Sequence, residues 1–350
     1  MKKLMTGNSA LAEGAIMAGC EAYFGYPITP QNEIPEYMSK RMPEEGRVFL
    51  QSESELAAIS MIMGAATTGA KVMTTSSSPG ISLMQEGISY LAGSELPAVI
   101  ANVVRGGPGL GNIWPAQSDY FQAVKGGGHG DYQMPVLAPN SVQETFDFVF
   151  LAFDLAFKYK NPALILTDGL IGQMMEPLEM RNPETLRIPG VSFEKESWAL
   201  TGAKGRRPRS FKSLYLGDGV LEKHNIALQK KYSDIKKNEI KFELFEADDA
   251  EILFVAYGIT SRVCREVVCQ LREKGIKAGL LRPITLWPFP ESYLEEKAVS
   301  LKKIITVELS HGQMVEDIRR AVNGKCPVEF YGRSGGAVLT DEDIITNCKL

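Results

Sequence analysis

Short apolar runs alternate with segments of helical periodicity in the first third of the chain. Residues 47–51 form one apolar run, residues 55–69 have helical periodicity, and residues 71–75 form a second run. A further helix is predicted over residues 82–94, followed by a strand over residues 97–104. Strands joined by one helix and short connections pair in parallel, because each helix returns the chain to the same end of the sheet. The pattern therefore predicts an α/β fold with a parallel sheet.

The same alternation continues on both sides of this stretch. Before it, the sequence predicts a helix of small residues over 7–19, capped by Asn8 or Ser9, a strand over 23–26 and a helix over 31–41. After it come a strand over 135–139, a helix over 141–158 capped by Asn140 or Ser141, and a strand over 162–167. We therefore expect a doubly wound first domain over residues 1–185.

The pattern changes after residue 185. In residues 186–247, Pro, Arg and Lys recur and apolar periodicity is weak, which predicts a linker region of loops with one exposed helix. Strands are expected again over 252–257, 278–282, 303–308 and 327–331, with helices over 260–274 and 312–322. Residues 248–350 therefore predict a second, smaller parallel-sheet domain.

Composition argues against several classes of protein. The chain has 350 residues, of which 44% are hydrophobic and 23% charged, as in ordinary globular proteins. Its net charge of −4 does not favour nucleic acid as a partner. No run approaches the roughly 20 apolar residues of a membrane span, and Gly7, Asn8 and Glu13 interrupt any signal-peptide core. We therefore expect a cytoplasmic protein.

The cysteines do not suggest a redox centre within this chain. There are five, they are scattered, and no two are spaced as Cys-x-x-Cys: they are Cys20, Cys264, Cys269, Cys326 and Cys348. Such a set predicts neither a disulfide framework nor an iron–sulfur cluster held by this chain alone. Any redox centre would have to come from another chain.

Polar residues gather where the predicted strands end. In open parallel sheets, ligands bind in the crevice beyond the carboxyl ends of the strands. Here these ends carry residues 52–55, 76–80 and 105–107, and the 23–26 strand runs into a turn over residues 27–30. An acid, several hydroxyls, flexible glycines and a base would therefore meet at one rim of the sheet. This arrangement is typical of a ligand site.

Two interpretations of Glu55 are open. It stands three residues after Ser52, and this capping-box spacing predicts that it merely caps its helix, which is the commoner role for that spacing. Alternatively, it places a carboxylate beside a cofactor ring nitrogen. The following helix is almost entirely apolar or small, so the acid would face a low-dielectric pocket. Desolvation there raises the pKa of a carboxyl group and favours proton exchange.

Three other side chains also have a structural and a functional interpretation. Arg105 either closes a strand at the surface or clamps a substrate carboxylate with its planar guanidinium. Thr29 either stabilises its turn or bonds an anionic ligand. His129 is a weak candidate for proton transfer, because a lone histidine is more often structural. Its loop, residues 126–131, and residues 106–111 are so rich in glycine that we expect loops covering a pocket.

Several segments in register resemble the alpha subunit of 2-oxoacid:ferredoxin oxidoreductases. They are residues 25–31 (Gly-Tyr-Pro-Ile-Thr-Pro-Gln), 51–60, 76–84 and 115–120 (Pro-Ala-Gln-Ser-Asp-Tyr). Residues 126–131 and 138–144 look most like the branched-chain, 2-oxoisovalerate type of this family. The resemblance covers nearly the whole chain and is weakest over residues 190–247.

This resemblance implies a thiamin-pyrimidine-binding domain followed by a domain like the transketolase C-terminal one. Thiamin diphosphate would be shared between chains, and the glutamate that bonds its aminopyrimidine N1′ would be Glu55 rather than Glu53. In the family this acid lies nine residues before the helix glycine, which is Gly64 here. The turn residues Pro27 and Ile28 would contact the same cofactor.

The resemblance also implies a reaction and an assembly. Thr29 and Arg105 would hold the carboxylate of a 2-oxoacid, which is decarboxylated as electrons pass to iron–sulfur clusters and ferredoxin and the acyl group passes to coenzyme A. The chain has no cluster cysteines, and its Gly-Asp-Gly at 217–219 lacks the paired asparagines of a diphosphate–magnesium motif. It would need a beta subunit for the diphosphate and Mg²⁺ and gamma- or delta-type subunits for the clusters, in a dimer of heteromers.

Three alternatives stay open. As a substrate, 2-oxoglutarate is favoured only slightly less than a branched-chain 2-oxoacid, because the sequence does not locate the residues that select the substrate's side chain. An aryl-pyruvate enzyme of the same family usually fuses both thiamin domains into one longer chain, so 350 residues argue against it. A non-catalytic scaffold that kept only the fold is disfavoured by the presence of Thr29, Glu55 and Arg105.

Overall fold

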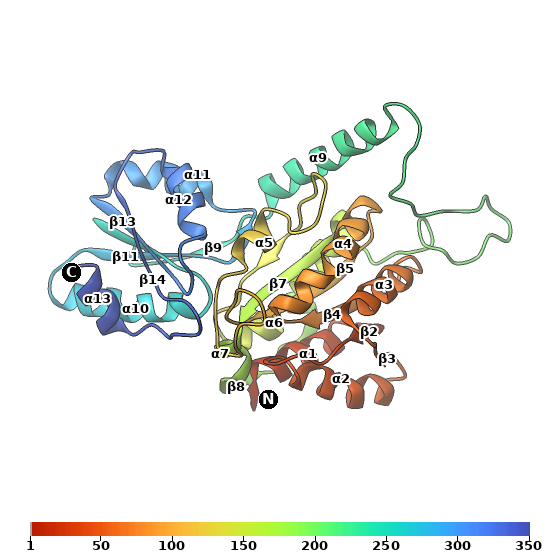
Figure 1. Ribbon diagram of the computed structural model, residues 1–350, viewed down its shortest axis with the longest axis horizontal. Coiled ribbons are helices and arrows are strands. Elements are labelled where there is room, and N and C mark those ends of the chain that lie inside the picture. Colours follow the sequence, from red (N-terminus) through yellow and green to blue (C-terminus); the bar gives the residue numbers. More distant parts are fainter. Residues whose placement is uncertain (1) are drawn as a thin grey trace.

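β5 (Ala98–Val104) lies at the centre of the larger sheet, and all of its residues are buried. Because side chains alternate between the faces of a strand, Val99 and Val103 pack on one face while Ile100 and Val104 pack on the other. Strands that are apolar on both faces need helices on both faces, as in parallel α/β sheets. The computed structural model, which describes residues 2–350, has this arrangement (Figure 1).

The larger sheet has seven strands, and six of them run parallel. In spatial order they are β12 (Thr285–Trp287), β6 (Val136–Leu137), β7 (Pro162–Asp168), β5, β4 (Val72–Ser76), β2 (Ala22–Gly25) and β3 (Val48–Gln51). The predicted doubly wound parallel sheet is confirmed. β12, which pairs antiparallel with β6, comes from the second half of the chain and was not predicted.

Helices cover both faces of this sheet. α1 (Gly7–Met17), α2 (Glu33–Glu44) and α6 (Val142–Tyr159) pack on one face, and α3 (Glu55–Ala66) and α4 (Ser78–Gly93) on the other. β1 (Lys2–Thr6) and β8 (Met175–Glu179) form a separate antiparallel pair. The shorter helices are α5 (Tyr120–Val124), α7 (Gly169–Gln173) and α8 (Pro183–Leu186).

The smaller sheet has five strands, and the four predicted ones are confirmed. Its spatial order is β14 (Val328–Gly332), β13 (Lys303–Glu308), β10 (Ile252–Val255), β11 (Ala278–Pro283) and β9 (Phe242–Phe245), the last antiparallel to β11. α10 (Gly258–Glu273) and α13 (Asp341–Asn347) pack on one face. α11 (Glu291–Lys297), a short 3₁₀ helix (Ala298–Ser300) and α12 (Met314–Val322) pack on the other, in an apolar cluster continuous with that of α3 and α4.

One long helix follows the irregular segment between the two sheets. α9 (Val220–Asn238) was predicted as exposed, yet it buries Leu228, Tyr232 and Ile235 against the body of the protein (Figure 1). Residues 187–219, which precede it, contain no helix or strand. None of the helices within residues 2–350 combines the length and the apolar character needed to span a bilayer.

Two expected helix starts differ in the structure. α1 is capped by Thr6, whose hydroxyl accepts from the Ser9 amide, and not by Asn8 or Ser9. The Asn8 side chain is instead directed outward from the helix and donates to the Pro30 carbonyl at 2.8 Å. α4 starts at Ser78 rather than residue 82, because a proline in the first turn, where no intrahelical N–H bond is needed, is compatible with a helix. The predicted cap of α6 by Ser141 is confirmed.

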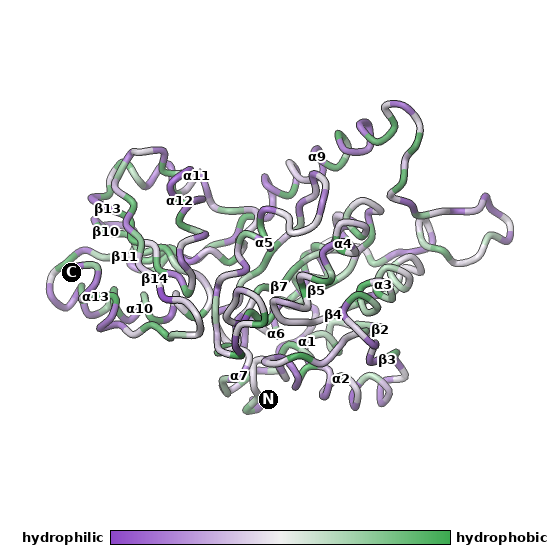
Figure 2. Tube along the Cα trace, viewed as in Figure 1, coloured by the Kyte–Doolittle hydropathy of each residue, from purple (hydrophilic) through white to green (hydrophobic). Residues whose placement is uncertain are grey.

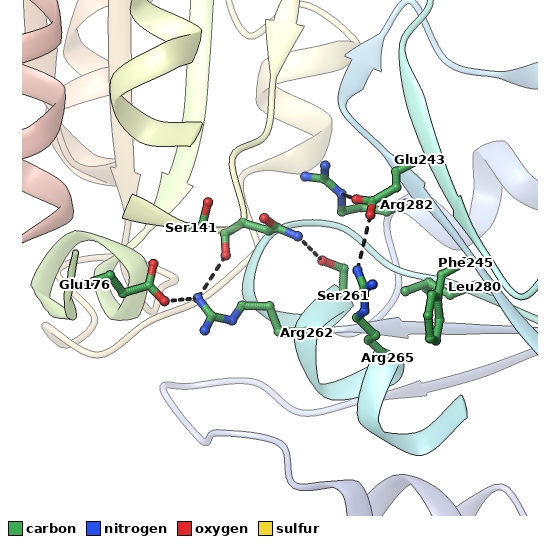
Figure 3. Close-up of a pocket in the computed structure, with 10 residues that line it drawn as sticks. Ser141, Glu176, Glu243, Phe245, Ser261, Arg262, Arg265, Leu280 and Arg282 are labelled. Atoms are coloured by element: carbon green, nitrogen blue, oxygen red, sulfur yellow. Dashed lines mark hydrogen bonds and ion pairs between the residues drawn. The ribbon is translucent and has the colours of Figure 1, made fainter. Parts of the chain in front are cut away.

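Ion pairs join the two sheets. The buried guanidinium of Arg282, on β11, donates two 2.7 Å bonds to Glu144 of α6 and one of 2.9 Å to Glu243. Arg262 of α10 pairs with Glu176 at 2.7 Å. Figure 3 shows Arg262, Arg282 and their partners Glu176 and Glu243, which line a cavity of about 330 Å³. Each arginine that lines this cavity has a carboxylate partner, so the charges are balanced within the chain.

The Arg282–Glu144 pair should contribute strongly to stability. We expect Arg282→Met to lower the free energy of unfolding by about 2–4 kcal/mol, because it leaves the Glu144 carboxylate without its partner at the junction. Urea denaturation would measure this loss. Arg265→Met is the control: its side chain is 53% exposed, so we expect a change within about 0.5 kcal/mol. Equal losses in the two variants would contradict the prediction.

Candidate active site

The carboxyl ends of β2, β3, β4 and β5 meet at one edge of the larger sheet, with Ser52 following β3. The Arg105 guanidinium, just after β5, donates to the Thr29 carbonyl, after β2, at 2.9 Å. The Arg105 amide donates to the Ser78 hydroxyl, after β4, at 3.1 Å. The Ser52 hydroxyl donates to the Gly25 carbonyl at 3.1 Å. The structure therefore brings together the four strand ends on which the sequence places polar residues.

Glu55 is the first residue of α3 and is 5% exposed. The capping-box interpretation is wrong, because the residue that caps α3 is Ser54, whose hydroxyl accepts from the Ala57 amide at 3.2 Å. Ser52, which was expected to cap the helix, instead bonds the end of β2. The Glu55 carboxylate is thus free of any capping role, and its contact is the Ser76 hydroxyl at a long 3.5 Å. Its place at a helix N-terminus favours the negative charge.

Gly80 allows α4 to approach this carboxylate. A Cβ atom at Gly80 would lie 2.4 Å from Glu55 Oε1 and 2.0 Å from Ser76 Oγ, well inside van der Waals contact. The helix can therefore pack here only without a side chain at this position. This close packing fixes the Glu55 carboxylate against the end of β4.

Arg105 carries a buried charge without a counter-ion. Its side chain donates to two backbone carbonyls, those of Thr29 and Leu110, at 2.9 and 3.1 Å. Its Nε atom is buried and has no acceptor within residues 2–350, and no carboxylate in that range pairs with it. Burying an unpaired charge is costly, so the geometry favours an anionic ligand at this position.

Two side chains from elsewhere in the chain hold the turn that carries Pro27, Ile28 and Thr29. The Asn8 and Gln173 side chains both donate to the Pro30 carbonyl at 2.8 Å. Ile28 and Thr29 are half-buried and Pro27 is exposed, so these three residues border the rim rather than the core. Sequence reasoning missed Asn8 and Gln173 as supports, because nothing local in the sequence links them to this turn.

A second buried polar network supports the segment after β4. The Asn102 side chain donates to Asp119 at 2.9 Å and accepts from the Ser78 amide at 3.0 Å. Burial raises the pKa of Asp119, and its bonds from Ser78 and Asn102 counter that shift. At the end of β7, burial raises the pKa of Asp168 to about 6. Asp119 lies within a segment that carried the family resemblance, and that was the available signal for it.

A cavity of about 550 Å³ opens between this rim and the smaller sheet. Its lining includes Ser78, Gly107 and Asp119 from the larger unit and His311 and Ser334 from the smaller one. The glycine-rich segment 106–111 does border a cavity, as expected. The other glycine-rich segment, residues 126–131, borders a separate cavity of about 220 Å³.

His129 lies away from the rim. It is exposed, its carbonyl accepts from Ser89 near the end of α4, and its ring stands edge-on to Tyr90. The structure therefore separates His129 from Glu55 and Arg105. Within residues 2–350, no group of three or more His, Cys, Asp or Glu is arranged to hold a metal ion.

Two family descriptions match the chain. Residues 13–241 match pyruvate flavodoxin/ferredoxin oxidoreductase, thiamine diphosphate-binding. Residues 250–344 match pyruvate:ferredoxin oxidoreductase core domain II. The first match contains all four strand ends of the rim.

Several relatives resemble the chain along nearly its whole length. It is 51% identical, over 98% of this chain and 96% of the relative, to ketoisovalerate oxidoreductase subunit VorB of Methanothermobacter thermautotrophicus. It is 37% identical, over 97% of this chain and 96% of the relative, to 2-oxoglutarate synthase subunit KorA of Methanothermobacter marburgensis.

Solved structures share the fold. A 2-oxoglutarate:ferredoxin oxidoreductase from Magnetococcus marinus, with 2-oxoglutarate, coenzyme A and succinyl-CoA bound, matches with a TM-score of 0.88 and 28% identity. The match covers 99% of this chain but 65% of that longer chain. A split-gene transketolase matches with a TM-score of 0.56 and 14% identity over 98% of this chain and 95% of that one, a likeness of fold alone.

Gly80→Ala should displace the Glu55 carboxylate. We expect a loss of about 1–3 kcal/mol in the free energy of unfolding, because the new methyl group overlaps Glu55 and Ser76. Gly64→Ala, in α3, is the matched control: nothing lies within 4 Å of its Cβ position, so a gain of about 0.5–1 kcal/mol is expected. Chemical denaturation of both variants measures the difference. An unchanged free energy of unfolding for Gly80→Ala would show that α4 is not closely packed against the Glu55 carboxylate.

Proposed function

The chain belongs to the thiamine diphosphate-binding pyruvate flavodoxin/ferredoxin oxidoreductase family, and from this premise we propose that it is the alpha subunit of a 2-oxoacid:ferredoxin oxidoreductase. The complete enzyme would decarboxylate a 2-oxoacid, transfer the acyl group to coenzyme A and pass the electrons to ferredoxin. Such a substrate carries a carboxylate beside a ketone. The site therefore needs an anion-binding group next to a thiamin-binding acid.

The unpaired guanidinium of Arg105 carries the substrate part of this proposal. Elsewhere in the structure, the buried Arg282 has carboxylate partners inside the chain, whereas Arg105 has none within residues 2–350. A substrate carboxylate would supply the missing negative charge and accept from Nε. The Thr29 hydroxyl, on the turn that Arg105 already binds, would donate a second bond to the same carboxylate.

Glu55 and the turn fit the aminopyrimidine end of thiamin diphosphate. When bound, this cofactor supplies the carbon nucleophile that attacks the ketone of a 2-oxoacid. The Glu55 carboxyl group would hydrogen-bond the ring N1′, and the Ser76 hydroxyl and the bare backbone of Gly80 hold that group in place. Pro27 and Ile28 would border the ring. Removing water from this buried acid strengthens the bond that it makes.

The outer face of α3 supports a partner subunit. After Glu55, α3 contains no charged residue, as its largely white-to-green colour in Figure 2 reflects. Its Leu56 is 52% exposed. On α4, Leu83 is 56% exposed between the exposed polar residues Ser82 and Glu86, so the apolar outer face belongs to α3. An amphipathic helix at a free surface would present polar residues here, so an apolar outer face indicates a covered one. We propose that a beta subunit, carrying the diphosphate-binding domain and Mg²⁺, covers this face.

The remaining partners follow from the chemistry of electron transfer. The five cysteines are spread through the chain and unpaired, so the iron–sulfur clusters would belong to gamma- or delta-type subunits and ferredoxin would accept the electrons. We propose a dimer of such heteromers, in the cytoplasm. We also propose a division of this chain into a thiamin-pyrimidine-binding domain (1–185), a linker region (186–247) and a transketolase C-terminal-like domain (248–350).

2-Oxoisovalerate is the substrate we propose. The support is the difference in identity between the ketoisovalerate subunit, at 51%, and the 2-oxoglutarate subunit, at 37%. 2-Oxoglutarate is the second candidate, because the solved enzyme with that substrate shares the fold over 99% of this chain. Reduction of benzyl viologen by the chain co-purified with its partners, given each 2-oxoacid in turn, would decide between them.

Glu55→Gln should abolish most of this activity. We expect kcat to fall by about 10²-fold or more, because an amide cannot exchange a proton with N1′ as a carboxyl group does. The viologen assay with 2-oxoisovalerate, thiamin diphosphate, Mg²⁺ and coenzyme A measures the loss.

Glu53→Gln is the matched control for this variant. Glu53 is exposed, and its carboxylate bonds the neighbouring Ser54 hydroxyl at 3.3 Å, so its loss should leave kcat unchanged. Inactivity of Glu53→Gln together with an active Glu55→Gln would reverse the assignment. An intact, cofactor-loaded complex that oxidises no 2-oxoacid would remove the enzyme proposal itself.

A charge on the outer face of α3 should prevent assembly. We expect Leu56→Asp to weaken binding of the beta subunit by about tenfold or more, because it buries a carboxylate in an apolar interface, while the chain alone folds normally. Val299→Asp, at a 74% exposed position on the 3₁₀ helix far from this face, should assemble like the wild type. Size-exclusion chromatography of the co-expressed subunits measures both, and normal assembly of Leu56→Asp would contradict the prediction.

A further inference from the structure

Residues 200–217, here called the basic arm, project from the body of the protein. Figure 1 shows this segment extending away from both sheets, before the chain returns to α9. It contains no helix or strand, and most of its side chains are exposed. Irregular segments of this length are uncommon in compact proteins unless they have a function. The arm therefore calls for an explanation beyond connecting two domains.

The arm carries positive charge without any negative charge. It has five basic residues, and no Asp or Glu occurs between Glu196 and Asp218. None of the five pairs with a carboxylate in the described part of the chain. They are Lys204, Arg206, Arg207, Arg209 and Lys212. The net charge of the chain is −4, so these five residues create a local positive field that is suited to binding an acidic surface.

The base of the arm is fixed to the ends of α3 and α4. The Leu200 amide donates to the carbonyl of Thr67, the residue that caps α3, at 2.8 Å. The Ser213 side chain lies against Gly93, the last residue of α4. The Arg209 guanidinium donates to the Ala199 carbonyl at 2.7 Å, which holds the outgoing and returning segments of the chain together at the base of the arm. The arm thus has a defined starting direction.

These anchors place the arm at the carboxyl ends of α3, whose outer face is apolar, and of α4. The candidate active site lies at the amino ends of the two helices, and the arm leaves from their carboxyl ends. Leu214 and Leu216, at the end of the arm, are 68% and 87% exposed and add apolar area near the carboxyl ends of the two helices. A chain that covers the face between these two ends would meet the arm at its edge.

We propose that the basic arm binds an acidic surface on the subunit that covers the outer face of α3, and so clamps that subunit to this chain. The inference depends on the proposed function, which supplies the covering subunit. The apolar face provides the buried centre of the interface, and the arm provides a charged rim that steers the partner and slows its release. Such a rim contact weakens with added salt, because mobile ions screen exposed charges.

The test removes charge from the arm in the co-expressed complex. The variant is Lys204→Ser with Arg207→Ser and Lys212→Ser, three exposed residues whose loss leaves the Arg209 anchor intact. Dissociation on dilution is followed by mass photometry. We expect the dissociation constant to rise about tenfold at about 50 mM NaCl and to approach the wild-type value at about 0.5 M NaCl.

The matched control removes the same number of charges elsewhere. Lys40→Ser, Lys274→Ser and Lys277→Ser change three exposed lysines that form no ion pair within residues 2–350, and this variant should dissociate like the wild type. A second arm variant, Leu214→Ser with Leu216→Ser, keeps the charges and should weaken the complex at both salt concentrations. Equal thermal unfolding of the free chains excludes misfolding as the cause.

Two outcomes would overturn the inference. Either the arm variants bind the partner as tightly as the wild type, or they alter self-association of this chain while partner affinity is unchanged, which would make a second copy the occupant. Turnover of 2-oxoacids by the wild-type complex is measured separately. If the complex oxidises a 2-oxoacid but the arm variants bind the partner like the wild type, only this inference is wrong. If the assembled complex oxidises no 2-oxoacid, the proposed function is wrong.

Discussion

Parallel pairing of β2, β4 and β5 is the constraint on which the candidate site depends. Because these strands run in one direction, the segments that follow them leave the sheet at the same edge. The bond from the Arg105 guanidinium to the Thr29 carbonyl then fixes the turn after β2 against the end of β5. A register shift of one residue would direct these strands' side chains to the opposite faces and separate the site.

The two buried arginines, Arg282 and Arg105, differ in whether a carboxylate of the chain compensates their charge. At the junction between the sheets, Arg282 is matched by Glu144 and Glu243, so its charge is satisfied internally and stabilises the packing of the two units. At the rim, Arg105 is buried among carbonyls with no carboxylate beside it, and Glu55 is held in place by close packing at Gly80. Local arrangements that raise the energy of the free protein are typical of functional sites, where a ligand completes them.

The surface shows a similar incompleteness. α3 is apolar on its outer side, and the basic arm leaves the protein at the far end of the same helix. The candidate site at one end of this face and the unpaired basic arm at the other are the observations behind our proposal that another chain covers it. In the proposed enzyme, the rim would hold the pyrimidine end of the cofactor and a second chain on this face would supply the rest of its site.

The sequence by itself determined the alternation of strands and helices, the parallel sheet and the identity of the polar residues at the strand ends, because these depend on local periodicity and chain direction. It did not determine that Ser54 and not Ser52 caps α3, that Thr6 caps α1, or that β12 joins the larger sheet. Those features are decided by which backbone groups the tertiary packing leaves unpaired. The tertiary structure alone likewise placed Gly80 against the carboxylate and left Arg105 without a counter-ion, since both depend on distances between segments far apart in the chain.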